Sequence, residues 1–301
     1  MKNLKRRQFN RFVIVSTAVA ALGVPVERAE AQQRSVLLGI RMRPMTTTDQ
    51  SNTGTDGSDG ADSEIVIQTI DPENGQIQDR AQPQLQGGTP SVLRRDERIG
   101  GFAALAKGSL FLTKTQGVPG EPEVISRLTV SNGSSQTLTV TGLGENNTVE
   151  SLLITNDGSI LCIVSLNSGV PPFRLATIDA QTGKASLVEG FNFPPNARFS
   201  NLTQCPNGTI YGTSLGTEGS VRLVQLDLQK RQIIDLPLLR FEKRTLSNDL
   251  KSLTCSGTDQ LYALADPIKR GSNLLLTVDI GTGAMNLVEE VDAEKITFSR
   301  P

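Results

Sequence analysis

The sequence contains no histidine and no tryptophan, and it has only two tyrosines among 301 residues. Without histidine, the chain cannot form a Ser-His or Cys-His nucleophile pair, a histidine general base or a histidine metal ligand. This inventory excludes the common hydrolases and metalloenzymes that depend on such groups. Catalysis by carboxylates, lysine, tyrosine or a bound cofactor is still compatible with the composition.

The chain also lacks an excess of positive charge. It carries 30 Lys and Arg against 31 Asp and Glu, and six of the basic residues but only two of the acidic ones lie in residues 1–31. The rest of the chain is therefore acidic, whereas proteins that bind the phosphate backbone normally have a basic surplus. We expect no nucleic-acid partner.

Residues 1–31 have the organisation of an export signal, in which basic residues precede a short apolar run and a cleavage site with small residues. The pair Arg6 and Arg7, followed by Gln-Phe, resembles the twin-arginine motif, and Ala29 and Ala31 occupy the positions that a signal peptidase reads. The apolar run is shorter than the roughly twenty residues of a membrane-spanning helix. An ordinary Sec signal is the alternative. We expect a soluble, monomeric, periplasmic or secreted bacterial protein with no transmembrane segment after cleavage.

Two short apolar runs separated by a turn form a pattern that recurs from about residue 100 onward, at intervals of about fifty residues. The copies are Phe102–Leu112, Leu152–Leu161, Leu202–Tyr211 and Leu253–Tyr262. Two of the turns contain Asp-Gly or Asn-Gly, which favours two-residue hairpins. Self-similarity at this period is typical of repeat architectures, and the alternating apolar residues that follow each copy predict β-strands.

Each repeat predicts four antiparallel strands, which is the organisation of a β-propeller blade. In three repeats the third strand ends in an aspartate, Asp179, Asp227 or Asp279, and leads into a polar turn. In this respect residues 96–288 resemble the YVTN and quinoprotein-like propeller repeats, whose third strand commonly ends in an Asp before a turn with Gly. The resemblance implies an all-β propeller and says little about activity, because such folds serve enzymes, binding proteins and scaffolds alike.

The two ends of the chain complement each other. The first unit begins with Ser35–Arg41, which matches a second strand, and the segment Lys295–Pro301 matches a first strand with nothing after it. The C-terminal strand can therefore complete the first blade and close a ring of five four-stranded blades. We expect one propeller domain over residues 32–301, with a flexible loop at 44–63. The alternative is a ring of four blades with residues 32–95 as a separate arm.

Binding residues are expected on the face of the propeller that carries the long loops, around the central channel. Basic residues on this face are candidates for binding a carboxylate, sulfate or phosphate group; the alternative is a set of solvated loop charges. Phe191 and Phe193 are candidates for an apolar platform, although such a segment also folds back over the core. The basic candidates are Arg94, Arg95, Arg98, Arg198, Arg240, Lys243, Arg244, Lys269 and Arg270.

Three aspartates and three cysteines are the remaining candidates for metal or redox chemistry. Asp56, Asp59 and Asp62 are weak calcium ligands, because their spacing of three does not match an EF-hand loop and no Glu falls at the required place. Cys162, Cys205 and Cys255 are an odd number in an exported protein. Since neighbouring blades splay apart, we expect three free cysteines that pack as small hydrophobic residues.

The leading hypothesis is an exported, non-catalytic propeller that binds an envelope protein, a glycan or a small anionic ligand through its long-loop face; a purely structural envelope component is not distinguished from it. The alternative is a calcium-dependent enzyme of the lactonase or sugar-dehydrogenase type, which the fold resemblance implies. Such enzymes hold calcium with Glu, Asn and Asp of the innermost strands, and many use a catalytic His. Here those strands offer mainly Asn201, Lys251, Ser151 and Ser299. We therefore expect no cofactor, and a binding protein rather than an enzyme.

Overall fold

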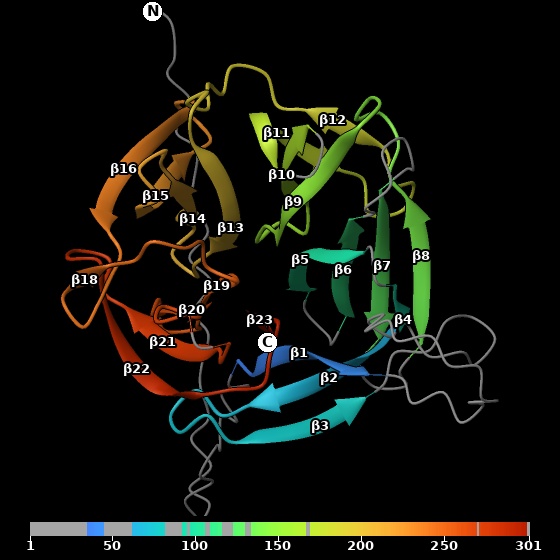
Figure 1. Ribbon diagram of the computed structural model, residues 1–301. Coiled ribbons are helices and arrows are strands. Elements are labelled where there is room, and N and C mark those ends of the chain that lie inside the picture. Colours follow the sequence, from blue (N-terminus) through green and yellow to red (C-terminus); the bar gives the residue numbers. More distant parts are fainter. Residues whose placement is uncertain are drawn as a thin grey trace, which may run out of the picture. The chain divides into compact units, whose positions relative to one another are not determined.

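The computed structural model shows five antiparallel β-sheets arranged as the blades of a β-propeller, and the predicted fold class is confirmed (Figure 1). The described residues contain strands and turns but no helix, and hence no helix with the length and hydropathy needed to cross a bilayer. The signal residues Arg6, Arg7, Ala29 and Ala31 lie outside the described part of the chain. The structure describes residues 35–44, 62–81, 92–94, 97–105, 109–115, 123–129, 134–166, 169–269 and 271–299.

Each blade has four principal strands, which run in sequence order from the centre of the ring outward. Blade 1 is the exception, because its innermost strand comes from the C-terminus. It contains β23 (Lys295–Phe298), β1 (Leu37–Pro44), β2 (Ser63–Ile70) and β3 (Ile77–Ala81), with the short β4 (Val92–Leu93) beside β2. Blade 2 contains β5 (Arg98–Leu105), β6 (Ser109–Thr115), β7 (Val124–Thr129) and β8 (Ser135–Thr139).

Blades 3 to 5 repeat the same order. Blade 3 contains β9 (Asn147–Ile154), β10 (Ile160–Leu166), β11 (Val170–Ile178) and β12 (Ala185–Leu187). Blade 4 contains β13 (Arg198–Gln204), β14 (Ile210–Leu215), β15 (Val221–Asp227) and β16 (Gln232–Leu238). Blade 5 contains β19 (Ser252–Cys255), β20 (Leu261–Ala265), β21 (Leu274–Val278) and β22 (Ala284–Glu290), extended at its outer edge by the hairpin of β17 (Arg240–Phe241) and β18 (Arg244–Thr245).

The ring is closed by the C-terminal strand. β23 pairs antiparallel with β1, in a register that runs from Leu37 opposite Phe298 to Ile40 opposite Lys295. The five-blade closure predicted from the two chain ends is therefore confirmed, and the four-blade alternative is wrong, because β1, β2 and β3 form a blade. β1 ends at Pro44 and β2 begins at Ser63; the loop expected between them lies at 45–61, outside the described residues.

Burial decreases from the centre of the ring outward. In β9 every residue after Asn147 is buried, whereas the outermost strand β16 has no buried residue. The inner strands are covered on both faces by neighbouring blades, so both faces are apolar, as in any sheet that is packed on two sides. The core consists of the interfaces between blades: Phe173 of blade 3, for example, packs edge-on against Phe199 of blade 4, with ring centroids 6.1 Å apart.

The recurring aspartate at the end of the third strand stabilises a tight turn. The Asp179 carboxylate accepts hydrogen bonds from the backbone N–H groups of Gln181 and Thr182, at 3.0 and 2.7 Å. The turn ends at Gly183, whose φ of 72° suits glycine and whose position leaves no room for a Cβ, because that atom would lie 2.3 Å from the carbonyl oxygen of Thr139. The motif thus lets the turn of one blade contact the outer strand of the preceding blade.

A bulge near the start of the innermost strand recurs in three blades. The pairing of β5 with β6 skips Gly100, that of β9 with β10 skips Glu150, and that of β13 with β14 shifts at Asn201, which has a φ of 58°. A bulge interrupts the alternation of side chains and re-aims those around it. These three positions are about fifty residues apart, so the bulge belongs to the repeat.

Two of the three cysteines form a disulfide, so the expectation of three free cysteines is wrong. Cys205, directly after β13, and Cys255, at the end of β19, are bonded, with their Cα atoms 5.2 Å apart. Blades splay only at a distance from the axis; their innermost strands converge at the channel, where the Cα separation falls in the range that a disulfide requires. Cys162 is free and fully buried in β10, and burial raises the pKa of its thiol to about 12.

Candidate functional site: the two ends of the central channel

The central channel is lined by the five innermost strands, each of which contacts the next around the ring: β5, β9, β13, β19 and β23, which contacts β5 again. Side-chain hydrogen bonds join neighbouring strands. The Ser151 hydroxyl of β9 accepts from the backbone N–H of Leu202 at 2.6 Å, and the Thr254 hydroxyl of β19 accepts from that of Phe298 at 3.0 Å. The starts of the five strands meet at one end of the channel and their ends at the other, and the two ends differ in chemistry.

At the end where the strands start, a buried carboxylate is surrounded by cations and hydroxyls. The Glu150 side chain is only 1% exposed. Its oxygens accept hydrogen bonds from the Arg98 guanidinium at 2.7 and 2.8 Å, and from the hydroxyls of Thr148 and Ser165 at 2.7 Å each; Arg198 lies at 3.4 Å. Burial by itself would raise the pKa of Glu150, but the charge and hydrogen bonds of Arg98 and the two hydroxyls hold it below its ordinary value.

A second carboxylate, Asp249, continues this network toward blade 5. It accepts a hydrogen bond from the Ser200 hydroxyl at 3.0 Å and pairs with Nε of Arg198 at 3.8 Å. Burial raises the pKa of Asp249 despite these partners. The neighbouring Lys295 donates to the carbonyl of Lys251 at 2.5 Å, and burial, with a smaller contribution from Arg98, lowers its pKa to about 8. The start of the channel is therefore filled by charged side chains that hold one another.

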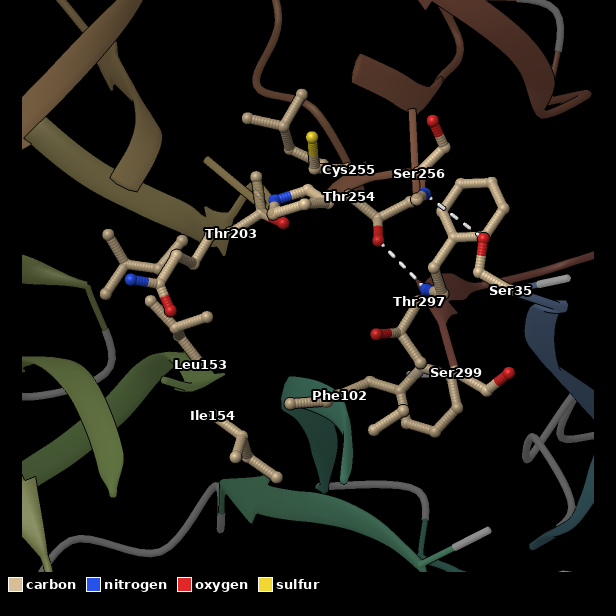
Figure 2. Close-up of a pocket in the computed structure, with 18 of the residues that line it drawn as sticks. Ser35, Phe102, Leu153, Ile154, Thr203, Thr254, Cys255, Ser256, Thr297 and Ser299 are labelled. Atoms are coloured by element: carbon tan, nitrogen blue, oxygen red, sulfur yellow. Dashed lines mark hydrogen bonds between the residues drawn. The ribbon is translucent and has the colours of Figure 1, made fainter. Parts of the chain in front are cut away.

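At the other end, the strands end around a cavity of about 480 Å³. Phe102 of β5, Leu153 and Ile154 of β9 and Phe298 of β23 supply apolar walls. Figure 2 shows how hydroxyl-bearing residues, among them Thr203, Thr297 and Ser299, lie among these apolar side chains around the hollow. None of the described residues that line this cavity is an Asp, Glu, Lys or Arg, and Cys255 on its wall is part of the disulfide. The cavity therefore offers shape and hydrogen bonds, without a charged acid or base.

Of the basic candidates that the structure describes on the long-loop side, Arg98 and Arg198 lie together at the channel, on either side of Glu150. Arg244 and Lys269 line a hollow at the outer edge of blade 5, with Arg240 on the adjoining strand and Lys243 exposed in the β17–β18 turn. Arg94 is exposed beside β4. Arg95 and Arg270 lie outside the described residues. The seven candidates that the structure describes therefore do not form one cluster, and the role of the set as a ligand site stays a prediction.

Phe191 and Phe193 are partly buried and pack against the interface between blades 3 and 4. The ring of Phe193 meets that of Phe199 edge-on, with centroids 4.8 Å apart. This is the packing of a segment folded back over the core. Of the weak calcium candidates, Asp62 is exposed just before β2, and Asp56 and Asp59 lie outside the described residues.

One set of potential metal-binding groups lies near the cavity. The sulfur atoms of Cys205 and Cys255 and the carboxylate of the exposed Asp259 lie within 4.8 Å of one another. The disulfide occupies both sulfurs, however, and a disulfide does not supply the thiolates that metals bind.

A Glu-Asn-Asp set does occur in the channel, contrary to the reading of the sequence. Glu150, Asn201 and Asp249 come from three consecutive blades, and the Asn201 amide donates to the carbonyl of Leu250 at 3.0 Å, next to Asp249. These groups do not fit calcium. Arg98 and Arg198 already neutralise Glu150, and Arg198 also pairs with Asp249, so that guanidinium groups stand where a cation would bind.

Sequence reasoning missed Glu150, Asp249 and Lys295. Their signal is nevertheless present: near the start of every innermost strand stands a charged residue, at positions 98, 150, 198, 249 and 295. Charged side chains are rare within apolar strands unless they are paired. A search of the repeat for charges, in addition to its apolar pattern, would have found this ring.

The sequence matches no family model and no curated protein. Among solved structures, it is similar to a putative exo-β-1,3-galactanase from Bifidobacterium bifidum (TM-score 0.49, 14% identity, covering 69% of this chain and 74% of that one). It is also similar to the periplasmic gluconolactonase of Pseudomonas aeruginosa (TM-score 0.45, 12% identity, 89% and 86%). A catalytically inactive virginiamycin B lyase from Staphylococcus aureus gives a TM-score of 0.40 at 13% identity over 84% and 88%. Likenesses this distant carry no argument about activity.

Proposed function

We propose that the protein is an exported, non-catalytic β-propeller that binds a small, uncharged, partly apolar ligand in the cavity at the ends of its innermost strands. The observation that carries the proposal is the lining of that cavity, which combines Phe and Leu side chains with hydroxyls and contains no charged residue among those described. Its volume of about 480 Å³ lies in the range of small-molecule sites. Such a lining orients a ligand and supplies no group to transfer a proton to or from it.

The cavity is also held in a fixed shape, which favours binding. The hydrogen bond between Thr254 and the backbone of Phe298 joins two of its walls, and the Cys205–Cys255 disulfide joins blades 4 and 5 at its edge. A ligand that enters a preformed site loses less free energy to the ordering of the protein. The ligand would therefore replace water in the cavity without rearrangement of the blades.

Export rests on two independent observations. Residues 1–31 have the pattern of a signal, and a disulfide between neighbouring blades is a feature of proteins that mature outside the reducing cytoplasm. The proposed ligand would then be one that the protein meets in the periplasm or the medium. A glycan or an envelope component with an uncharged apolar part has the required chemistry.

The test is a thermal-shift screen of the mature protein with uncharged small molecules, followed by titration calorimetry of the hits. Thr203→Phe should abolish binding because it fills the cavity, whereas Thr203→Val keeps the volume and removes only a hydroxyl. Thr137→Phe on the exposed outer strand of blade 2 is the control for the added ring. Binding that survives Thr203→Phe would contradict the location. Recovery of a chemically changed ligand by mass spectrometry, with or without calcium, would contradict the non-catalytic role.

A further inference from the structure

The charges at the start of the channel form a ring with an odd number of members. In order around the ring they are positive, negative, positive, negative and positive: Arg98 before the bulge of β5, Glu150 in β9, Arg198 in β13, Asp249 before β19 and Lys295 in β23. Three of the contacts between neighbours are ion pairs, with distances of 2.7, 3.4 and 3.8 Å. In a ring of five charges, opposite signs cannot alternate at every contact, so one contact must join like charges.

That contact lies where β23 meets β5 and places Lys295 beside Arg98. Two cations in one partly buried site repel each other, and the ring as a whole has one more positive than negative charge. The groups that face Lys295 are Asp249, Arg98, Glu150 and Glu294, together with the carbonyl of Lys251. Asp249, Glu150 and Glu294 attract Lys295, but among the described residues none of them forms an ion pair with it, and Glu294 pairs with Lys251 instead.

A second cavity opens at this contact, separate from the one at the other end of the channel. It measures about 340 Å³ and is lined by Arg98, Lys251 and Lys295, with Met42, Leu93 and Ile99 as an apolar wall. Its two carboxylates have other partners.

Glu294 pairs with Lys251 at 2.8 Å, and Glu97 accepts from the backbone N–H of Arg94 at 2.8 Å and lies 4.0 Å from Lys114. The Arg98 side chain, which is 38% exposed, thus lines this cavity together with Lys295, next to apolar atoms.

We propose that this second cavity is a binding site for a small monocarboxylate with a short apolar tail. The carboxylate would supply the negative charge that the odd ring lacks, with the Arg98 guanidinium donating to it and Lys295 neutralising it. The tail would lie against Met42, Leu93 and Ile99. A single negative charge matches the single excess positive charge, and the apolar wall favours an organic acid over an inorganic ion. This site is independent of the uncharged ligand proposed above.

The experiment is titration calorimetry of the mature protein with butyrate, and with butanol and sulfate as probes that lack the charge and the tail, respectively. Butyrate should bind, butanol should not, and sulfate should bind more weakly than butyrate. Lys295→Met should weaken butyrate binding about tenfold or more, because it removes one cation and keeps a side chain of similar length. Lys295→Arg should retain butyrate binding. Lys184→Met, at an exposed position in a turn of blade 3, should change nothing.

The wild-type protein provides a second readout that does not depend on a variant folding. Strong binding requires the protonated amine of Lys295, so butyrate affinity should fall as the pH rises from 7 to 9. Binding near pH 8 should also take up protons, so the measured heat of binding should depend on the buffer.

Equal binding of butyrate and butanol, an unchanged affinity in Lys295→Met, or a flat pH profile would each overturn the proposal. Because Thr203→Phe should leave butyrate binding intact, failure of one site is distinguishable from failure of the other.

Discussion

At the start of the innermost strands the channel is filled by ion pairs, whereas at their ends it widens into an uncharged cavity, although the same five strands build both ends. The difference follows from position along the strand. Near their starts β5, β9 and β13 carry a bulge, which breaks the alternation of side chains and in β9 leaves room for Glu150 between two arginines. Farther along, regular pairing places apolar residues such as Leu153 and Phe102 in the walls, with hydroxyls between them.

The comparison teaches that one repeat can hold two unrelated kinds of interaction. Ion pairs join neighbouring blades at one end of the channel, and an uncharged cavity lies at the other. The following predictions test this division, from the largest expected effect to the smallest.

Deletion of residues 295–301 should have the largest effect, because β23 contributes to both ends of the channel. It removes Lys295 from the ring and Phe298 from the cavity, and it leaves the edge of β1 that faces away from β2 unpaired. We expect an unfolded or aggregated protein in size-exclusion chromatography and circular dichroism. A truncated protein with an unchanged melting temperature would show that the closure is dispensable.

Glu150→Gln should destabilise the protein by about 3 kcal/mol, the low end of the range for a broken buried pair, because Arg98 loses its counter-charge and Arg198 keeps only Asp249. At the other end of the channel, Thr203→Val removes a hydroxyl from the cavity wall and should cost less than about 1 kcal/mol. Urea unfolding of the two variants measures the difference directly. Glu218→Gln in an exposed turn is the control for the loss of a surface carboxylate. Equal effects of Glu150→Gln and Thr203→Val would mean that the two ends do not differ in structural importance.

Replacement of both Cys205 and Cys255 by alanine should lower the free energy of unfolding by about 2–4 kcal/mol, the usual contribution of a disulfide that closes a long loop. A reducing agent should lower the melting temperature of the wild type and leave that of the double variant unchanged. Cys162→Ala should keep the sensitivity of the wild type to reduction, because Cys162 is free. Sensitivity to reduction that persists in the double variant would exclude this bond as its source.

Lys295 should give an effect of unusual sign, which appears only as a change of stability with pH. Its pKa is about 8 in the folded protein, below its ordinary value of 10.5, so between these values the unfolded state binds more protons and stability should rise with pH. Other groups titrate in the same range, so the measurement is the difference between wild type and Lys295→Met from pH 7.5 to 10. The wild type should gain stability relative to the variant over this range. A constant difference would show that Lys295 has an ordinary pKa.

Much of this fold is readable from the order of residues. The fifty-residue spacing of the apolar runs predicts blades, and the unmatched strands at the two chain ends predict their closure, because strand patterns are local and repeat. Two conclusions from the sequence did not hold. The expectation of free cysteines assumed the wide spacing that neighbouring blades have far from the axis, whereas Cys205 and Cys255 lie near it. The expectation that no Glu-Asn-Asp set is present overlooked Glu150, which a bulge turns into the channel.

The candidate site was less accessible to prediction, for a physical reason. Long loops suggested where a ligand would bind, and two of their arginines, Arg98 and Arg198, do lie at the channel. The larger cavity lies at the opposite end, beside tight turns, and its lining of Leu, Phe and Thr looks like any other strand sequence. A cavity depends on how five strands that are far apart in the chain converge, and no local pattern records that distance.

The sequence by itself indicated the repeated blade, the two chain ends that can complete one blade and the charge near the start of each innermost strand, since each of these is a local pattern. Only the tertiary structure decided how those charges meet. Five blades form an odd ring, so alternating charges must leave one unmatched contact, and that contact falls at the closure between the two ends of the chain, beside Lys295 and Arg98. This follows from the geometry of a closed ring of five, which no single repeat contains.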